Sequence, residues 1–401
     1  MLKFATRINL TIMHRTAYFL HPLLGADDTW QAYLIESATL TATSSLFEQL
    51  TQTSQLSEFD HRQPWFVPVN SLASDAIAPV SFVPSFFANP PSNDITPLAD
   101  LEAGFRHEKR KLALFASPEK GLPGSGEWDY LMIVSSHARS LPPYTLLGMA
   151  SRTAVVMTDL HNTQERQWAL VNGCTMTTGE FLVIPNGDSK PADTSRLRLL
   201  ELLGLVAADA ETSELEAILR QEAKLSYSLL RLVNSAAIAP RTAITSFGQA
   251  INLLGRRQLQ RWLQLLVYAD SEHGHHPSPL LQKAAYRGRL MELLASHFPE
   301  VAELPDISDT AFMIGAFSLL NILLNLRMAE ILEHLPLPEI AHNALGARSG
   351  ALGQLLEALD QADRRELSKA TEMLTDLEID GATFLDAQLD ALSWAGKIRA
   401  A

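Results

Sequence analysis

Two kinds of hydrophobic pattern divide the chain. Up to about residue 190, the apolar runs have the length of strands and lie between polar, Pro or Gly residues. These runs are Tyr18–Leu20, Trp65–Val69, Lys111–Phe115, Tyr130–Val134, Ala154–Met157 and Glu180–Ile184. Helix-like stretches at Ala38–Leu56 and Gln164–Val171 lie between them, and the Pro-rich segment Pro79–Pro97 predicts an irregular connection. Strands that alternate with helices predict an α/β domain with a largely parallel sheet.

The pattern changes after the turn-rich run Pro185–Pro191, beyond which apolar residues recur at helical spacing. Ser246 and Gln249 match the capping box that opens a helix, and Gly255 predicts the end of that helix. Three more apolar stripes predict helices: Leu259, Trp262, Leu263 and Leu266; Leu367, Ala370, Leu374 and Leu377; Leu385, Leu389 and Leu392. The second half is therefore predicted to be all-helical.

Length, charge and cysteine content narrow the class of protein. A chain of 401 residues predicts two domains, which we place at 1–190 and 191–401. The formal charge of −13 argues against nucleic acid as a partner. The single cysteine, Cys174, excludes an intramolecular disulfide and predicts a cytoplasmic protein. The uncharged stretch Ala311–Leu326 is shorter than the ~20 apolar residues that span a bilayer, so we expect a buried helix and no membrane partner.

Several isolated motifs favour a structural interpretation over a chemical one. The glycines of Gly121–Gly126 precede a predicted strand instead of following one, which predicts a turn and not a phosphate-binding loop. The histidines of Glu272–His276 lie beside prolines with no helical spacing, which predicts a solvated loop and not a metal site. Cys174 has no basic neighbour in sequence, so an inert packed thiol is expected.

The helical half resembles a known family. Asn234 and Ser235 follow a leucine-rich helix, where such residues cap a helix end or, less often, contact a ligand. With Leu225–Ala236, the capped segment up to Gly255, and Ala311–Leu320, they resemble an HDOD domain, a relative of the HD phosphohydrolases. The resemblance covers nearly all of residues 193–395. It implies a helical interaction domain, because Phe317–Leu320 stands where an HD enzyme has its His-Asp pair.

HDOD domains of this form are typically fused behind an EAL domain, and the first half resembles one. His21–Leu24 resembles the opening Gln-Pro-Ile segment, Gly173 and Thr178–Leu182 resemble the final turn and strand, and Pro185 matches the closing proline. EAL domains are α/β barrels of the TIM type that hydrolyse cyclic di-GMP with two divalent metals. The resemblance therefore implies a TIM-like barrel followed by an all-helical HDOD domain.

The EAL ligand positions are mostly replaced. Asn70 fits the family's Asn ligand and would be the remnant of the metal site, but Leu34 stands where the signature Glu belongs. The other departures are Phe115–Ser117 for Asp-Asp-Phe, Met132–Val134 for Lys-x-Asp, His161 for the later Glu, Thr178 for Gln, and no carboxylate within Val80–Phe87. Since hard divalent cations need several carboxylate oxygens, the resemblance implies no catalytic residue, no metal and no cofactor.

The resulting expectation is a non-catalytic adaptor that binds a protein partner and acts in cyclic di-GMP-related regulation of motility, surface behaviour or biofilm. Asn234, Ser235 and Gly255 would be its interaction or structural motif. Two alternatives remain open. The first is a weak phosphodiesterase that uses Asn70, His161 and Glu36. The second is a receptor that binds cyclic di-GMP without hydrolysis, and its phosphate contacts would come from Arg106, Arg110, Arg139 and Arg152.

Overall fold

The computed structural model contains two compact units. Its described residues are 17–38, 54–69, 81–88, 96–184, 244–268 and 278–398, with short pieces at 46, 50, 203–205, 207–208, 210–211, 213–215, 229–230 and 233–234. The barrel unit comprises Met1–Ile184 and Ala362–Leu389, and the helical unit comprises Pro185–Gln361 and Asp390–Ala401. The change near residue 185 lies close to the boundary expected from sequence, but residues 362–389 pack with the barrel. The two-domain division at residue 190 stays a prediction.

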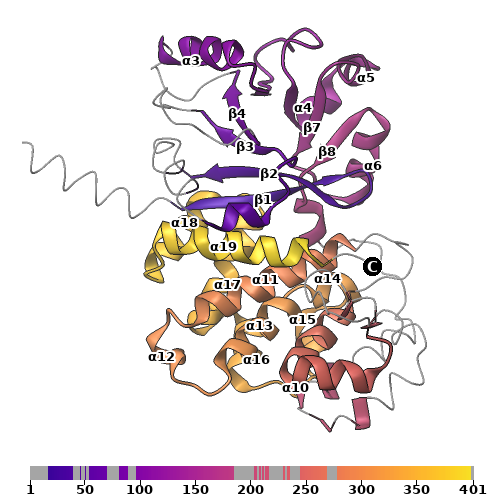
Figure 1. The fold of residues 1–401 in the computed structure, drawn as a ribbon, viewed down its shortest axis with the longest axis vertical. Coiled ribbons are helices and arrows are strands. Elements are labelled where there is room, and N and C mark those ends of the chain that lie inside the picture. Colours follow the sequence, from indigo (N-terminus) through magenta and orange to yellow (C-terminus); the bar gives the residue numbers. More distant parts are fainter. Residues whose placement is uncertain are drawn as a thin grey trace, which may run out of the picture. The chain divides into compact units, whose positions relative to one another are not determined.

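The barrel unit is built on a closed barrel (Figure 1). Its strands are β1 (Tyr18–Gly25), β2 (Trp30–Ser37), β3 (Trp65–Pro68), β4 (Phe82–Phe87), β5 (Ala113–Phe115), β6 (Tyr130–Val134), β7 (Ala154–Thr158) and β8 (Cys174–Thr177). β1 runs antiparallel to both of its neighbours, and every other neighbouring pair is parallel. The predicted α/β barrel is confirmed.

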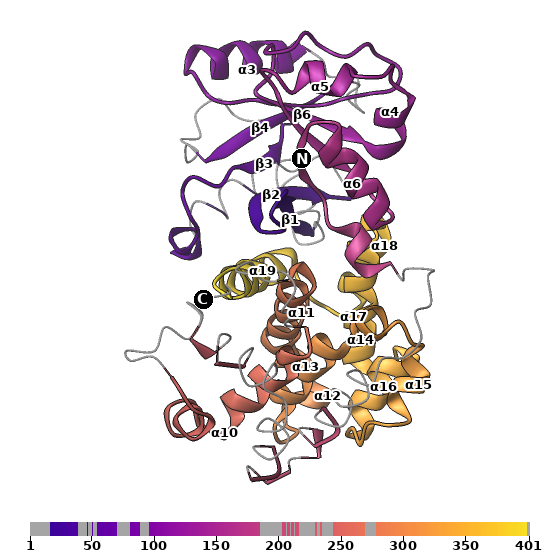
Figure 2. The same cartoon turned by 90° about the vertical axis from the view of Figure 1, so that its right-hand side faces the viewer.

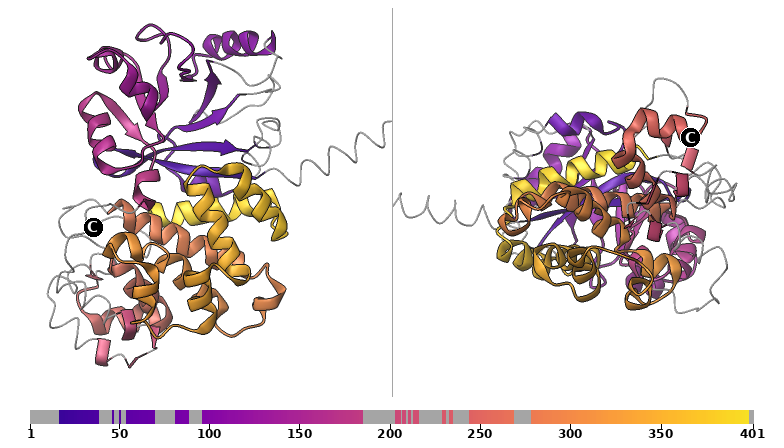
Figure 3. Two further views of the ribbon diagram at one scale, coloured as in Figure 1. Left: turned by 180° about the vertical axis from the view of Figure 1, so that it is seen from behind. Right: turned by 90° about the horizontal axis from the view of Figure 1, so that it is seen from below.

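Apolar side chains from alternate positions fill the barrel. The buried set is Leu23, Ala32, Leu34, Phe66, Val83, Ala113, Met132, Val156 and Met176. Because side chains alternate along a strand, Leu34 inside means that Glu36 also points inward, one step nearer the end of β2. On the outside lie η1 (Ser54–Glu58), α3 (Thr96–His107), α4 (Ser135–Ser140), α5 (Thr145–Met149) and α6 (Thr163–Val171), as Figures 2 and 3 show for the four α-helices.

Sequence patterning predicted some strands and missed others. Five of the six predicted runs overlap strands, and Gln164–Val171 lies within α6. The sixth prediction is wrong, because Glu180–Val183 is the short 3-10 helix η2. The irregular connection predicted at Pro79–Pro97 is also wrong, since β4 lies inside it. Pro84, one of the prolines of that segment, pairs with Val67 in the sheet. Most of Ala38–Leu56 lies outside the described residues.

A C-terminal pair of helices completes the barrel unit. α18 (Leu367–Asp376) follows α17 (Gly350–Asp363), and α19 (Gly381–Gly396) packs at the start of β1 (Figure 1). The buried Gln388 donates to the carbonyl of Tyr18 at 2.7 Å and accepts from the amide of Leu20 at 3.0 Å. β8 pairs only with Leu24 and Gly25 of β1, so the amide of Gln388 satisfies the edge that β8 leaves open.

The described part of the helical unit contains α10 to α16 and most of α17. The first seven are α10 (Phe247–Leu266), α11 (Pro279–Ala295), α12 (Pro299–Ala302), α13 (Ile307–Phe317), α14 (Leu320–Leu324), α15 (Met328–Leu332) and α16 (Glu339–Ala347). The predicted N-cap is confirmed, since Ser246 accepts from the amide of Gln249 at 3.3 Å, while the Gln249 side chain accepts from the amide of Thr245 at 2.8 Å and not from that of Ser246. The predicted helix end at Gly255 is a kink within α10 instead, with φ of +74°.

The longest uncharged stretch lies in the core of this unit. Ile307–Leu324 has the length and apolar composition of a membrane-spanning helix, and 67% of it is buried in the structure. Ser318 and Leu319 divide it between α13 and α14. Residues 311–320 are all buried, as expected from the sequence.

Close contact between α11 and α13 makes Gly315 a sensitive position. A Cβ atom built on Gly315 would lie 2.4 Å from the carbonyl oxygen of Arg287, so a side chain would force the two helices apart. We expect Gly315→Ala to lower the free energy of unfolding by about 1–3 kcal/mol, measured by urea denaturation of the full chain. Gly248→Ala is the control, because that position in α10 has open space and Ala favours the helix. Equal effects of the two substitutions would contradict this account.

Candidate functional site at the barrel mouth

Ionisable side chains gather at one end of the barrel, which we call the barrel mouth: the carboxyl ends of β2 to β8 together with the start of β1. Glu36 is the penultimate residue of β2 and pairs with Phe19 of β1. Glu180 follows β8 by three residues at the start of η2. The Nε2 atom of His21 lies 3.7 Å from Oε2 of Glu36. In parallel α/β barrels this end carries the functional groups.

Arg365 from the C-terminal segment joins the two carboxylates. Its Nη1 donates to Oε1 of Glu180 at 3.2 Å, and its Nη2 donates to Oε1 of Glu36. The exposed fractions of the side chains are 22% for Arg365, 15% for Glu36 and 10% for Glu180. The Oε2 atoms of both glutamates are buried and accept no hydrogen bond. The three residues therefore form a charge-assisted cluster that is largely removed from water.

Burial dominates the electrostatics of Glu36. It raises the pKa of the Glu36 carboxyl above the ordinary value of 4.5 because the charged form loses its hydration. Arg365 acts in the opposite direction, and the nearby charge of Glu180 adds to the increase. A carboxyl in a barrel mouth with a raised pKa is a candidate proton acceptor or donor.

Neutral side chains also line the described part of the mouth. Buried hydroxyl groups lie near the ends of four strands: Ser85, Ser135, Thr158 and Thr178. Phe87 ends β4 and Phe115 ends β5, and their rings stack with centroids 4.6 Å apart and planes 11° apart. Both rings are partly exposed, and Phe115 packs against the apolar barrel interior. The mouth thus combines a charged side with an aromatic side.

The residues proposed from the EAL resemblance differ in position and exposure. Asn70 lies outside the described residues, and Leu34 is fully buried in the barrel. His161 follows β7 but is exposed, with Nε2 3.6 Å from Oδ1 of Asp159. Glu36 is the one described member of the proposed phosphodiesterase set that lies inside the mouth.

The four arginines proposed for phosphate binding do not converge. Arg106 lies over the ring of Trp128 just before β6, and Arg110 and Arg152 precede β5 and β7, so these three are at the amino ends of the strands. Arg139 lies in α4, directly after β6, over the ring of Trp168. Only Arg139 of this set is on the mouth side.

The described residues do not fit a two-metal centre in this state. Among them there is no group of three or more His, Cys, Asp or Glu side chains arranged to hold a metal ion. The two carboxylates nearest to such a role, Glu36 and Glu180, both accept from Arg365. Both carboxylates are thus engaged by a side chain of the protein itself.

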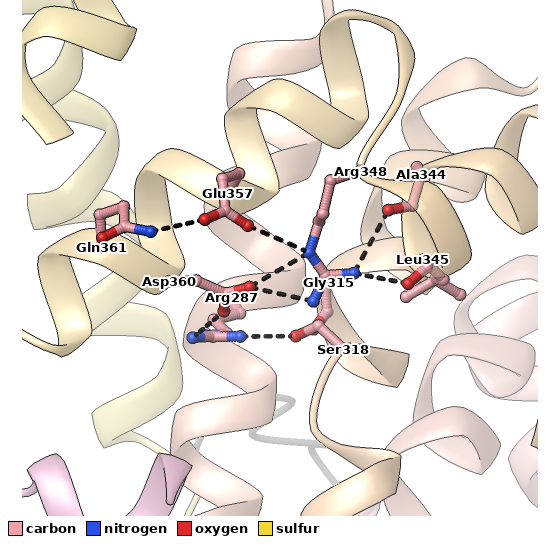
Figure 4. Close-up of polar contacts among 9 residues, drawn as sticks. All are labelled: Arg287, Gly315, Ser318, Ala344, Leu345, Arg348, Glu357, Asp360 and Gln361. Atoms are coloured by element: carbon pink, nitrogen blue, oxygen red, sulfur yellow. Dashed lines mark hydrogen bonds and ion pairs between the residues drawn. The ribbon is translucent and has the colours of Figure 1, made fainter. Parts of the chain in front are cut away.

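The helical unit holds a second buried ionic cluster (Figure 4). The side chain of Arg287 is only 1% exposed and lies 2.8 Å from Asp360 and 3.0 Å from the hydroxyl of Ser318. Arg348 donates to the other oxygen of Asp360 at 2.9 Å and lies 3.8 Å from Glu357. Ser318 belongs to the stretch that stands where an HD enzyme has its His-Asp pair. A guanidinium and a hydroxyl thus meet there, and this cluster is structural.

The predicted interaction motif shows a structural role where it can be described. The side-chain amide of Asn234 donates to the carbonyls of Leu230 at 2.7 Å and Ile244 at 2.8 Å, and its oxygen accepts from the amide of Ile244 at 2.7 Å. These bonds hold the helix end to the chain ten residues later. Ser235 lies outside the described residues, and a Cβ on Gly255 would meet open space. The use of this motif in partner binding stays a prediction.

The inert state predicted for Cys174 agrees with its surroundings. The thiol is buried, and burial raises its pKa to about 12, so it is protonated at neutral pH.

Comparisons with known proteins agree with this architecture. Residues 195–315 match the HDOD domain family. Over 183 residues the chain is 30% identical to the cyclic di-GMP phosphodiesterase CdgJ of Vibrio cholerae, a match that covers 46% of this chain and 41% of CdgJ. The uncharacterised protein YuxH of Bacillus subtilis is 29% identical over 180 residues, with 44% and 42% covered. The chain thus spans about two fifths of the length of the curated relatives it matches.

Two solved structures with EAL domains also match. The EAL domain of Mycobacterium smegmatis DcpA is 13% identical, with a TM-score of 0.33, and covers 41% of this chain and 90% of that domain. The Bacillus subtilis YkuI protein, solved with its substrate c-di-GMP and calcium, is 16% identical, with a TM-score of 0.34, and covers 62% and 75%. The prediction of an EAL-like barrel followed by a helical HDOD domain is confirmed.

One prediction is wrong: that the chain is not an enzyme. The relative CdgJ, with which 183 residues align, is a cyclic di-GMP phosphodiesterase. The error has a physical source. Sequence comparison tested each EAL ligand position in turn; it considered Glu36 only in the alternative phosphodiesterase set and did not consider Glu180. Both carboxylates lie at the barrel mouth.

Removing the guanidinium should leave two buried carboxylates without a counter-ion. We expect Arg365→Met to lower the free energy of unfolding at neutral pH by about 3 kcal/mol, the lower end of the cost of breaking a buried ion pair. The pKa of Glu36 then rises further, so between 4.5 and the raised value the folded chain holds a proton that the unfolded chain has released. The variant should therefore regain stability as the pH falls through that interval.

Urea denaturation across this pH range measures the effect. Arg364→Met is the matched control, since it removes an exposed charge from the adjacent position. Adding Glu36→Gln to Arg365→Met should restore part of the loss at neutral pH. A loss that does not change with pH would contradict the assignment.

Proposed function

We propose that this chain is a signalling protein that binds cyclic di-GMP at its barrel mouth and hydrolyses it as a weak phosphodiesterase. The alignment with CdgJ carries the proposal, because CdgJ is a cyclic di-GMP phosphodiesterase and 183 residues of this chain align with it at 30% identity. The position of the ionisable cluster supports it, since the mouth of a parallel barrel is where substrates of such folds bind.

The two sides of the mouth suit the two parts of the nucleotide. Stacked, partly exposed rings such as Phe87 and Phe115 offer a surface on which a guanine base can stack. Arg139 is the one arginine of the proposed set at this end, and a guanidinium binds phosphate oxygens in a bidentate manner. The barrel therefore offers contacts for both the base and the phosphate.

Glu36 is the described group best suited to take a proton during hydrolysis. A phosphodiester bond is broken by adding water across it, and the water must lose a proton to a base. Burial raises the pKa of Glu36 above its ordinary value, which makes it a stronger base than an exposed carboxylate. The contact of Glu36 with Arg365 lowers its basicity, which is why we propose weak turnover.

Binding is tested by calorimetric titration of the full chain with cyclic di-GMP. We expect Phe115→Ala to weaken binding by about fivefold to a hundredfold, because stacking of one base contributes roughly 1–3 kcal/mol. Phe59→Ala is the matched control, since Phe59 is also partly buried but packs on Tyr33 and Trp65 outside the barrel. No heat with the unaltered chain, or equal losses for both variants, would overturn the site.

Hydrolysis is tested by following the linear dinucleotide product with Mg²⁺ or Mn²⁺ present. We expect slow turnover by the unaltered chain and a loss of at least about tenfold in Glu36→Gln, within the range typical for removing a general base. Binding of cyclic di-GMP should persist in that variant. Unchanged turnover in Glu36→Gln would remove Glu36 from the mechanism while leaving the binding proposal intact.

The protein-partner role of the helical half, the regulation of motility, surface behaviour or biofilm, and the cytoplasmic location all stay predictions.

A further inference from the structure

Three large apolar side chains lie exposed together on the outer wall of the barrel unit. Among the described residues five large apolar side chains are exposed, and three of them lie at α5 and α6: Tyr144 at 79%, Leu147 at 43% and Val171 at 76%. Tyr144 and Leu147 are three residues apart at the start of α5, so they share a face.

The same three side chains form one continuous patch. A Cβ atom built on Gly173 would lie 3.2 Å from Cδ2 of Leu147, so α5 packs against the turn that follows α6. Val171 is the last residue of α6, two residues before Gly173. Figure 1 shows α5 and α6 on the same side of the barrel. We call Tyr144, Leu147 and Val171 the α5–α6 patch.

The backbone presents the ring of Tyr144 to solvent on a rigid turn. Tyr144 has φ of +66°, a left-handed conformation that is unfavourable for a residue with a side chain. Pro142 and Pro143 precede it and restrict the chain. The carbonyl of Pro142 accepts from the amide of Thr145 at 3.2 Å and from its hydroxyl at 2.7 Å. An aromatic side chain held in this way loses little conformational entropy when it binds a partner.

The charge beside the patch is positive. The segment that runs from Arg139 to Arg152 contains no Asp or Glu, although the chain has a formal charge of −13. Both arginines are exposed. The guanidinium of Arg139 lies 5.2 Å from the ring of Trp168 in α6, and the amide of Arg152 donates to the carbonyl of Met149 at the end of α5. The patch therefore combines apolar side chains with two exposed cations.

A second copy of this chain does not suit such a surface. A two-fold contact brings the same surface of each copy together, so the arginines of one copy would face those of the other. Two chains that each carry a formal charge of −13 also repel each other. An acidic segment of a different protein has the opposite charge to the two arginines and can cover the apolar side chains.

We propose that the α5–α6 patch is a docking surface for a partner protein, and that it binds a segment in which apolar side chains lie beside carboxylates. Tyr144 and Val171 pack against the apolar side chains, and Arg152 pairs with a carboxylate. Tyr and Arg carry much of the binding energy at protein interfaces, so Tyr144 and Arg152 are the residues to test. The surface lies outside the barrel, and the proposal does not depend on the proposed function.

The test selects random short peptides, displayed on phage, for binding to the full chain. We expect the enriched peptides to carry Asp or Glu next to Leu, Phe or Trp. Synthetic copies are then titrated by fluorescence anisotropy, and Tyr144→Ser should weaken their binding at least about tenfold. Leu253→Ser is the matched control, since Leu253 is also exposed, at 59%, but lies in α10. Equal binding to the two variants would overturn the docking surface.

Charge reversal tests the acidic character of the partner. Arg152→Glu should weaken binding of the same peptides by about threefold to tenfold, and peptides whose Asp or Glu is replaced by Lys should recover it. Enriched peptides without acidic residues, or no recovery, would overturn this part of the proposal. Sedimentation of the full chain tests the second copy: a dimer that Tyr144→Ser dissociates would overturn the assignment to a different protein.

Discussion

The burial of one guanidinium between two carboxylates ties together three distant parts of the chain. Glu36 lies near the end of the second strand, Glu180 follows the last strand, and Arg365 lies 185 residues further on. None of these charges could be buried alone, since each would lose its hydration without compensation. The strand ends, the turn after β8 and the turn after α17 must therefore come together. Together with the bonds of Gln388 to β1, this cluster joins residues 362–389 to the barrel unit although the helical unit lies between them in sequence.

The helical unit also buries an arginine against a carboxylate. Arg287 is almost fully buried, and Asp360 receives both Arg287 and Arg348 through its two oxygens. Arg348 has a φ of +53° directly after α16, and Arg365 has a φ of +63° two residues after the end of α17. In both units the side chain of such an arginine pairs with carboxylates that are mostly buried.

Periodicity and turn chemistry predicted the fold well where the signal is local. The all-helical half, the cap at Ser246 and strands β6 and β7 follow directly from the pattern of apolar residues. The signals were weaker at β4, which contains Pro84, and at η2, whose apolar residues resemble a strand. The site was missed because it depends on residues 329 positions apart in sequence. The sequence held part of the information about Glu36. It lies two residues after Leu34, which in turn lies two after Ala32, so it points into the barrel as they do, but β2 was not predicted as a strand.

The replacement of most EAL ligand residues does not by itself exclude catalysis at the barrel mouth. A closed barrel brings the ends of its strands together, so a carboxylate can reach the same space from several strands or from the turns that follow them. Here most positions that resemble EAL ligands, Asn70 excepted, carry other kinds of side chain, while Glu36 and Glu180 place charge at the mouth from other positions. The contact of these two carboxylates with Arg365 joins residues as far as 329 positions apart, so it can be read only from the folded chain.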